Sequence, residues 1–338
     1  MGVIGVGRIG ALHVRTLQTL PGVSKVTVAD ADAATALRVA GALAVEAVET
    51  PEALVEAGVD ALVIAAATPG HAPLLRLAAA AGLPAFCEKP VALDLAAIDG
   101  VLSEVRRAGI LVQVGFQRRF DAGYRAAHDA VAAGALRTLL VVRATTHDPT
   151  PPAEEYIASS GGIFRDLHIH DFDAIRYVTG CEIVEVYADG AVLETPWFGD
   201  HGDVDTAVAV VRLSGGALGI LSGTRHDPLG YDVRLEVFGT GDSIVAAGAD
   251  GRSPLRSVEP GTAQPRGAGY ANFMERFEQA YRTELTVFVD TVRGGGSSAC
   301  TLEAARAALL AALAADRSRA ERRPVTIEEV TSANAPTG

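Results

Sequence analysis

A glycine-rich motif near the start of the chain constrains the fold more than any other feature. The motif, Gly5-Val6-Gly7-Arg8-Ile9-Gly10, follows a β-branched run and precedes an amphipathic stretch. In this context glycines allow a tight turn from a strand into a helix, and they let a pyrophosphate approach the backbone N–H groups of the helix N-terminus. The sequence therefore predicts an N-terminal dinucleotide-binding domain.

The residues that follow alternate short β-branched runs with longer segments rich in alanine and leucine. Such alternation is typical of βαβ units around a parallel sheet. Strands are expected at residues 3–6, 26–29, 61–65, 84–87 and 110–115, and helices at residues 8–20, 33–42 and 94–108. The pattern predicts an α/β fold whose first domain, residues 1–118, is a doubly wound parallel sheet of the Rossmann type.

Later in the chain the pattern changes to β-rich runs separated by glycine-containing turns, with one helix expected near Phe164–Val178. This pattern favours a large, mostly antiparallel open sheet in a second domain, residues 119–330. Apolar residues at helical spacing between Phe273 and Val292 predict a helix face in a core or at a subunit contact. Gly248–Gly269 is expected to be an irregular connection, and residues 331–338 a disordered tail.

Charge and cysteine content exclude several classes of protein. The 29 Lys+Arg against 41 Asp+Glu give a net charge of −12, which argues against nucleic-acid or membrane-surface partners. The three cysteines, which are odd in number and far apart, fit a reduced cytoplasmic protein without a structural metal. No apolar run approaches the ~20 residues of a membrane span. Because the first motif begins at Gly5, we expect no signal peptide and a cytoplasmic location.

Asp30 indicates which dinucleotide is bound. It ends the second predicted strand, about 20 residues beyond Gly10, where an acidic residue meets the ribose hydroxyls. An anionic Asp30 would repel a 2′-phosphate, and the next arginine is Arg38. The sequence therefore favours NAD over NADP.

Lysine is scarce, because Lys25 and Lys89 are the only lysines among the 29 basic residues. Burial and neighbours can tune a lysine, whereas an arginine stays protonated. Lys25 lies in a polar turn and is expected to be solvated. Lys89 lies in Glu88-Lys89-Pro90, directly after a predicted strand, and ligands of such sheets bind outside the carboxyl ends of the strands. We expect Lys89 to point toward the nicotinamide; the alternative is a surface lysine in a loop.

A third group of residues lies on the helix predicted near Phe164–Val178. Asp166, His170 and Asp173 would lie within about 60° of one another on one helix face. A histidine flanked by carboxylates can accept a proton near neutral pH. The alternatives are incidental surface charges, which is what we expect of His168 and Asp171, and a metal site, for which no further ligand arrives at matching spacing.

Four motifs together resemble the Gfo/Idh/MocA oxidoreductases, and among them most closely the inositol 2-dehydrogenases. They are Gly5-x-Gly7-x-x-Gly10, Glu88-Lys89-Pro90, Gly115-Phe116-Gln117-Arg118-Arg119-Phe120-Asp121 and Gly161-Gly162…Asp166-x-x-x-His170-Asp171. The likeness covers about residues 2–328. It implies NAD-dependent oxidation of a secondary alcohol on a cyclic polyol or sugar. It also implies that the open sheet forms a homo-oligomer, a dimer or a tetramer.

The resemblance also implies roles for individual residues. The family's catalytic residues fall on Lys89, Asp166 and His170. Expected cofactor contacts are Gly5, Gly7, Arg8, Ile9, Gly10, Asp30, Thr68, His71, Glu88 and Lys89. Expected substrate contacts are Lys89, Arg119, Asp166, His170, Asp173 and Tyr231. Gln117, where many inositol enzymes have Asn or Val, and the unmatched loop Thr195–Asp203 leave the exact substrate open.

These residues suggest a mechanism. In this hypothesis His170 takes the hydroxyl proton, Asp166 orients the imidazole, and Lys89 donates hydrogen bonds to the reacting oxygen. Two alternatives remain: a dehydrogenase of an aldose, an anhydrosugar or a keto-inositol, and a catalytically idle NAD-dependent sensor. A sensor has no need of a tunable lysine together with a carboxylate-flanked histidine.

Overall fold

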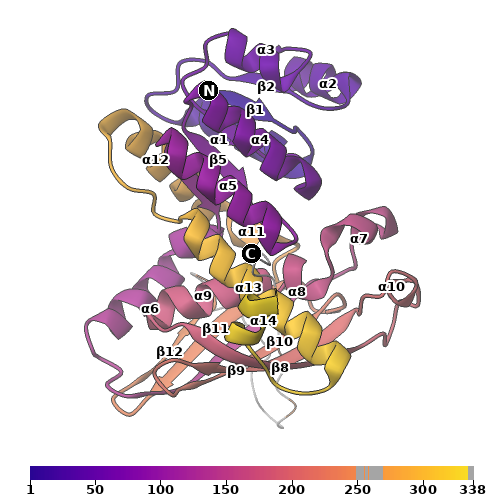
Figure 1. Ribbon diagram of the computed structural model, residues 1–338, viewed down its shortest axis with the longest axis vertical. Helices are drawn as coiled ribbons and strands as arrows, with labels where there is room; N and C mark the ends of the chain where they lie inside the picture. The colour runs from indigo at the N-terminus through magenta and orange to yellow at the C-terminus, as the bar shows by residue number, and fades with distance from the viewer. Residues whose placement is uncertain (249–254, 256–257, 259–268, 334–338) are drawn as a thin grey trace. The chain divides into compact units, whose positions relative to one another are not determined.

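The computed structural model describes residues 1–248, 255, 258 and 269–333, and the chain divides into two compact units (Figure 1). The first unit joins Met1–Gln117 to Tyr281–Arg306, and the second joins Arg118–Ala280 to Ala307–Gly338. The sequence had placed Tyr281–Arg306 in the second domain. The structure groups this segment with the first unit because its apolar side chains pack in that unit's core.

The first unit contains a six-stranded parallel sheet in the order β3-β2-β1-β4-β5-β6, which confirms the predicted doubly wound fold. Its strands are β1 Gly2–Ile4, β2 Thr27–Ala29, β3 Glu46–Ala47, β4 Leu62–Ile64, β5 Ala85–Glu88 and β6 Val112–Gly115. The sequence pattern missed the edge strand β3, because two residues make no β-branched run. The strand order reverses between β1 and β4, where open α/β sheets bind their ligands.

Helices connect these strands. They are α1 Arg8–Thr19, α2 Ala33–Leu43, α3 Pro51–Glu56, α4 Thr68–Ala81 and α5 Leu95–Ala108. The start of α5 shows how the sequence sets such boundaries. The Asp94 carboxylate accepts a hydrogen bond from the Ala97 N–H at 2.8 Å, which satisfies one of the N–H groups that a helix start leaves unpaired.

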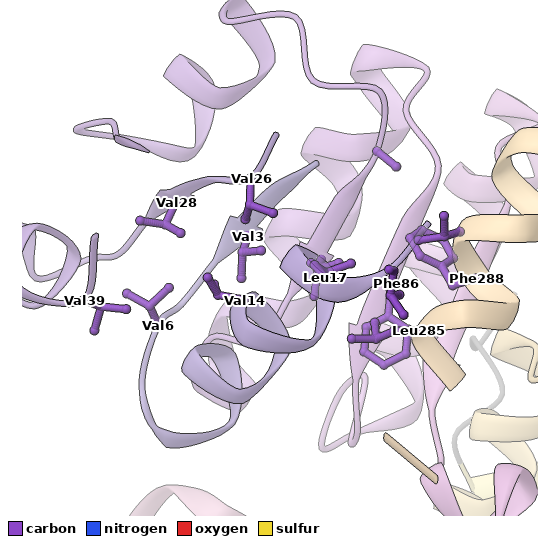
Figure 2. Packing of buried hydrophobic residues seen from close by; sticks show 14 of the residues in the cluster. Val3, Val6, Val14, Leu17, Val26, Val28, Val39, Phe86, Leu285 and Phe288 are labelled. Carbon is purple, nitrogen blue, oxygen red and sulfur yellow. The ribbon is translucent and has the colours of Figure 1, made fainter. Parts of the chain in front are cut away.

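The core of the first unit includes a helix from late in the chain, α12 (Glu278–Gly294). Figure 2 shows Val14 and Leu17 of α1 in the same cluster as Phe86 of β5 and Leu285 and Phe288 of α12. The rings of Phe86 and Phe288 lie 6.0 Å apart. The part of the predicted apolar stripe from Leu285 to Val292 therefore faces this core, whereas Phe273 and Phe277 lie before α12, in the second unit.

The second unit contains a seven-stranded sheet in the order β12-β11-β7-β10-β9-β8-β13. Its strands are β7 Leu139–His147, β8 Ile183–Ala191, β9 Thr206–Leu213, β10 Leu218–Thr224, β11 Asp232–Gly239, β12 Ser243–Ala246 and β13 Val325–Thr326. Neighbouring strands are antiparallel except for β7 and β10. The predicted large, mostly antiparallel sheet is confirmed.

The remaining helices lie wholly or largely in the second unit. They are the 3-10 helix η1 Gln117–Phe120, α6 Ala122–Ala132, α7 Glu154–Ser160, α8 Ile163–Asp166, α9 Ile169–Thr179, α10 Trp197–Asp200, α11 Phe273–Arg276, α13 Leu302–Glu321 and α14 Ile327–Ala333. Figure 1 shows α6, α8 and α9 on one side of the sheet. Along β9 buried and exposed residues alternate, so the strand has one buried and one exposed face.

The helix predicted near Phe164–Val178 is in fact two helices, α8 and α9, separated by Leu167 and His168. The backbone explains the interruption. The His168 N–H donates to the Ile163 carbonyl, five residues back, at 2.9 Å, so the helical hydrogen-bond ladder changes register here. A spacing argument that assumes one continuous helix therefore fails across this point.

The predicted tail starts too early, because α14 continues to Ala333. Residues 334–338, and most of the expected irregular connection at Gly248–Gly269, lie outside the described residues. In the described parts of the chain, no helix combines the length and the apolar character needed to cross a membrane.

Candidate active site

The glycine motif forms the turn between β1 and α1. Its three glycines differ in what an added Cβ atom would meet. Gly5 has a φ of 83°, and a Cβ there would lie 2.5 Å from the backbone of Ala66. A Cβ on Gly10 would lie 1.9 Å from the Gly5 carbonyl oxygen. A Cβ on Gly7 would meet no atom within 4 Å. Gly5 and Gly10 therefore allow close packing, while Gly7 leaves open space at the start of α1.

Asp30 follows β2, and its carboxylate is tied to the glycine turn. Oδ2 accepts a hydrogen bond from the Val6 N–H at 2.7 Å, and Oδ1 accepts one from the Asp32 N–H at 3.0 Å. Arg8 and Ile9 are the first two residues of α1; Arg8 is exposed and Ile9 is half-buried. The hydrogen bonds fix the acid beside the motif, as recognition of a ribose requires.

This arrangement fits a dinucleotide. The open space at Gly7 lies at the N-terminus of α1, whose backbone dipole favours negative charge. The first turn of α1 carries no acidic residue that would repel a phosphate. Gly7 and the N-terminal turn of α1 would hold the pyrophosphate, and Asp30 the ribose hydroxyls.

Two further predicted cofactor contacts lie on α4. Thr68 begins this helix, and His71 is buried within it. The Nδ1 atom of His71 lies 2.7 Å from the Pro90 carbonyl oxygen, and Nε2 lies 2.8 Å from that of Ala66. Burial lowers the pKa of His71, which favours the neutral ring. The ring thus connects α4 to the segment that follows Lys89.

Lys89 follows the last residue of β5 and is half-buried. Glu88, the residue before it, is buried, and its Oε1 lies 2.7 Å from Nε2 of His13. The Glu88 carboxylate therefore faces the interior of the first unit. The sequence analysis missed His13, because a single histidine in an amphipathic stretch gives no signal.

In the second unit, Asp166 is buried at the end of α8, and both of its carboxylate oxygens accept hydrogen bonds. The Tyr156 hydroxyl donates to Oδ1 and the Arg225 guanidinium to Oδ2, each at 2.7 Å. Arg225 also donates to Asp148 at 2.7 Å. Tyr156 and Arg225 were not predicted, since no sequence spacing connects them to Asp166.

His170 and Asp173 lie on α9 and not on one continuous helix with Asp166, which corrects the predicted common face. His170 is half-buried, whereas Asp173 is buried. Arg119 donates to both oxygens of Asp173, at 2.8 and 2.6 Å. Arg119 and Asp173, both predicted to bind substrate hydroxyls, are thus paired with each other.

The prediction that His168 and Asp171 are incidental surface charges is wrong, because both are fully buried. His168 Nδ1 lies 2.8 Å from Asp171 Oδ2. Asp171 also pairs with Arg118 and accepts a hydrogen bond from the Thr146 hydroxyl at 2.8 Å. Burial alone would raise the pKa of Asp171, but Arg118 and His168 outweigh it and lower this pKa. Asp171 is therefore a buried carboxylate held ionised.

Tyr231 immediately precedes β11 and is buried, with its ring edge against Phe277 at a centroid distance of 6.5 Å. Its N–H donates to the Tyr270 carbonyl at 2.7 Å. Burial raises the pKa of its hydroxyl, so Tyr231 remains a hydrogen-bond donor at neutral pH.

Two aspartates anchor the loop Thr195–Asp203. Asp203 accepts a hydrogen bond at 2.9 Å from the N–H of Ile163, the first residue of α8. The Asp205 carboxylate accepts from the N–H groups of residues 193–195. The loop that matched no known motif thus supports the start of α8.

Comparison with known families agrees with this description. Residues 1–116 match an oxidoreductase family with an NAD-binding Rossmann fold, and residues 124–245 match the GFO/IDH/MocA C-terminal domain. The chain belongs to the Gfo/Idh/MocA oxidoreductase family, as its motifs predicted. The predictions of an oxidoreductase and of an NAD cofactor are confirmed.

Its relatives include inositol dehydrogenases. Myo-inositol 2-dehydrogenase of Thermotoga maritima is 39% identical over 98% of this chain and 99% of its own. The scyllo-inositol 2-dehydrogenase (NAD(+)) of Bacillus subtilis is 35% identical, over 96% and 95%. A crystal structure of scyllo-inositol dehydrogenase from Lactobacillus casei, with NAD(H) and scyllo-inositol bound, has a TM-score of 0.86 at 29% identity and covers 97% of this chain and 98% of that chain.

Gly7→Ala tests the dinucleotide site. The new methyl group meets no protein atom, so we expect the free energy of unfolding to fall by at most about 1 kcal/mol, the effect of a poorer helix cap. The same methyl group occupies the space left for the pyrophosphate, so NAD should bind about tenfold more weakly or worse in a calorimetric titration. Gly41→Ala, at an equally open position within α2, is the matched control and should leave NAD binding unchanged. Native affinity in Gly7→Ala would contradict the assignment.

Proposed function

We propose that this chain is an inositol dehydrogenase that oxidises a ring hydroxyl of myo-inositol or scyllo-inositol to the keto-inositol. The observation that carries the proposal is the 39% identity, over nearly the whole of both chains, to a protein named myo-inositol 2-dehydrogenase. The buried, arginine-paired carboxylates around His170 support it, because they preorganise a polar site.

The proposed roles follow from the chemistry of the side chains. Bound NAD⁺ supplies the hydride acceptor. His170 takes the proton of the reacting hydroxyl, and Asp166, held by Arg225 and Tyr156, orients its imidazole. Lys89 donates hydrogen bonds to the reacting oxygen and stabilises its alkoxide character. Arg119, Asp173 and Tyr231 contact other hydroxyls of the substrate.

A substrate panel tests the proposal directly. Purified protein is mixed with NAD⁺ or NADP⁺ and with myo-, scyllo- and chiro-inositol or common aldoses, and NADH formation is followed by absorbance. We expect NAD⁺ reduction with an inositol. Faster turnover of an aldose would favour a sugar dehydrogenase, and no turnover of any compound would favour a sensor. Rapid NADP⁺ reduction would contradict the role of Asp30.

In the same assay, His170→Ala should lower kcat by about 10²- to 10⁴-fold and leave NAD binding intact.

Lys89→Arg tests the assigned lysine, and the only other lysine in the chain provides the control. An arginine keeps the positive charge but replaces a compact ammonium by a planar guanidinium. We expect kcat to fall by about 10²- to 10³-fold in Lys89→Arg. Lys25→Arg should keep native kinetics, because Lys25 lies on the surface and pairs with the exposed Glu46. Equal activity of the two variants would remove Lys89 from the mechanism.

We also propose that the enzyme works in the cytoplasm, where its free cysteines stay reduced.

The exposed face of the second unit's sheet is proposed to be the contact surface between copies of this chain. This face carries a group of apolar side chains that are between 39% and 52% exposed: Tyr187, Val208, Val210, Leu218 and Ile220. Tyr187 lies opposite Val210, which lies opposite Ile220, so the group is continuous across β8, β9 and β10. Such patches mark protein contacts.

The double variant Val210→Glu with Ile220→Glu tests this surface. Two carboxylates at the centre of the patch would have to be desolvated on pairing, so we expect a monomer by gel filtration with light scattering, and a dimer or tetramer for the unsubstituted chain. Leu37→Glu, at another exposed leucine, in α2, is the control and should keep the native mass. An unchanged mass in the double variant would show that this face is not the interface.

A further inference from the structure

A buried group of titratable side chains lies in the first unit and includes Glu88, the residue before Lys89. It consists of His13 on α1, Glu88 at the end of β5 and Glu284 on α12, and their ligand-type atoms all lie within 4.8 Å of one another. His13 and Glu284 are completely buried, and Glu88 is 8% exposed. Two carboxyl groups and one imidazole are thus enclosed together.

The contacts of the two carboxyl groups differ. Glu88 lies 2.7 Å from His13, which makes it one partner of a buried ion pair when the ring is protonated. Neither oxygen of Glu284 has a hydrogen-bond partner among the described residues. The Gln113 side chain, from the neighbouring β6, bonds to the Glu284 backbone carbonyl at 2.8 Å and not to its carboxyl group. Within the described parts of the chain, Glu284 therefore accepts no hydrogen bond that would stabilise a negative charge on it.

Other titratable groups close to this cluster lie on α12 and β5 and directly after β5. On α12, Tyr281 packs its ring against His13 at 6.0 Å. On β5, burial and then Glu88 raise the pKa of the Cys87 thiol, so it stays neutral. Lys89 follows Glu88 at the strand end. Burial, and next the charge of Glu88, raise the pKa of Glu284 well above its usual range.

We propose that Glu284 is a neutral carboxylic acid, and that with the His13–Glu88 pair it forms a buried proton-holding triad that positions the strand end carrying Lys89. The free energy needed to bury an isolated, ionised carboxylate in such an interior is far higher than that needed to bury the neutral carboxylic acid. With Glu284 neutral, the triad contains one carboxylate, Glu88, which lies 2.7 Å from the His13 ring. The triad touches neither substrate nor reacting atoms in this proposal; it acts through Glu88, which directly precedes Lys89. Its link to catalysis rests on the proposed function, whereas its protonation does not.

Glu284→Gln is the sharpest test, because glutamine has the shape of the neutral acid and does not titrate. Because the pKa of Glu284 is raised in the folded state, this group stabilises the folded state fully below about pH 4.3. That stabilisation is lost as the pH rises through the folded-state pKa. Between these two values, the unfolding constant of the native chain should increase about tenfold per pH unit relative to that of Glu284→Gln. Urea unfolding at several pH values measures this ratio. A ratio that does not change with pH would overturn the proposal.

Infrared spectroscopy provides an independent measurement on the folded chain. We expect the carbonyl stretch of a protonated carboxylic acid at neutral pH, lost in Glu284→Gln and kept in Glu303→Gln. Glu303 is the matched control because it is partly exposed and bonds to Arg106. Absence of this band from the native protein would overturn the proposal, as would a stoichiometric metal ion found by elemental analysis, since a cation would then replace the proton.

Activity supplies the third measurement. Because Glu284→Gln keeps the charge state of the triad, kcat and KM should remain within about twofold of native values. A loss of kcat beyond tenfold in a variant that folds normally would overturn the neutral assignment. The unfolding and infrared measurements need no substrate, so a chain that oxidises no polyol would refute the proposed function and leave the triad to be decided by these two measurements.

Discussion

The high free energy of an unpaired carboxylate in a protein interior organises both units of this molecule. In the second unit, each buried aspartate of α8 and α9 is matched by an arginine from another element. The pairs are Asp166 with Arg225, Asp171 with Arg118, and Asp173 with Arg119. In the first unit, the proposed solution for Glu284 is a proton. The arginine pairs hold α8 and α9 in one arrangement, and His170, which lies between the paired aspartates in the sequence, is held with them.

The features predicted correctly from the sequence are those set by neighbouring residues. The parallel strands, the start of α5 at Asp94 and the turn at Gly5 depend on contacts within one or two elements, so residue type and spacing were sufficient. The contact of Gly7 with the cofactor stays a prediction, which rests on equally local information. Its spacing in the motif implied close approach of a ligand, and the structure shows open space where a side chain would stand.

The features that were missed depend on residues far apart in the chain. Arg118 and Asp171 are separated by 53 positions, and Arg225 and Asp166 by 59, and no periodicity connects such pairs. The change of register at His168 had a further consequence. A continuous helix would place His168 and Asp171 off the face predicted to carry His170, whereas with the interruption both are buried in one polar network. For the same reason the apolar stripe of α12 revealed a core-facing helix but not the unit whose core it enters.

The use of arginine and not lysine at these buried pairs has a physical explanation. A guanidinium can donate two parallel bonds to one carboxylate, as Arg119 does, or join two carboxylates, as Arg225 does, while an ammonium is a compact point charge. A chain that stabilises buried aspartates with basic side chains therefore needs arginine at those positions. In the proposed mechanism Lys89 has a different task, because an oxygen that gains charge during a reaction is best met by a donor on a flexible stem. Glu88, its neighbour, is paired with His13. The pairing of carboxylates and the proposed stabilisation of the reacting oxygen are thus assigned to different types of basic residue.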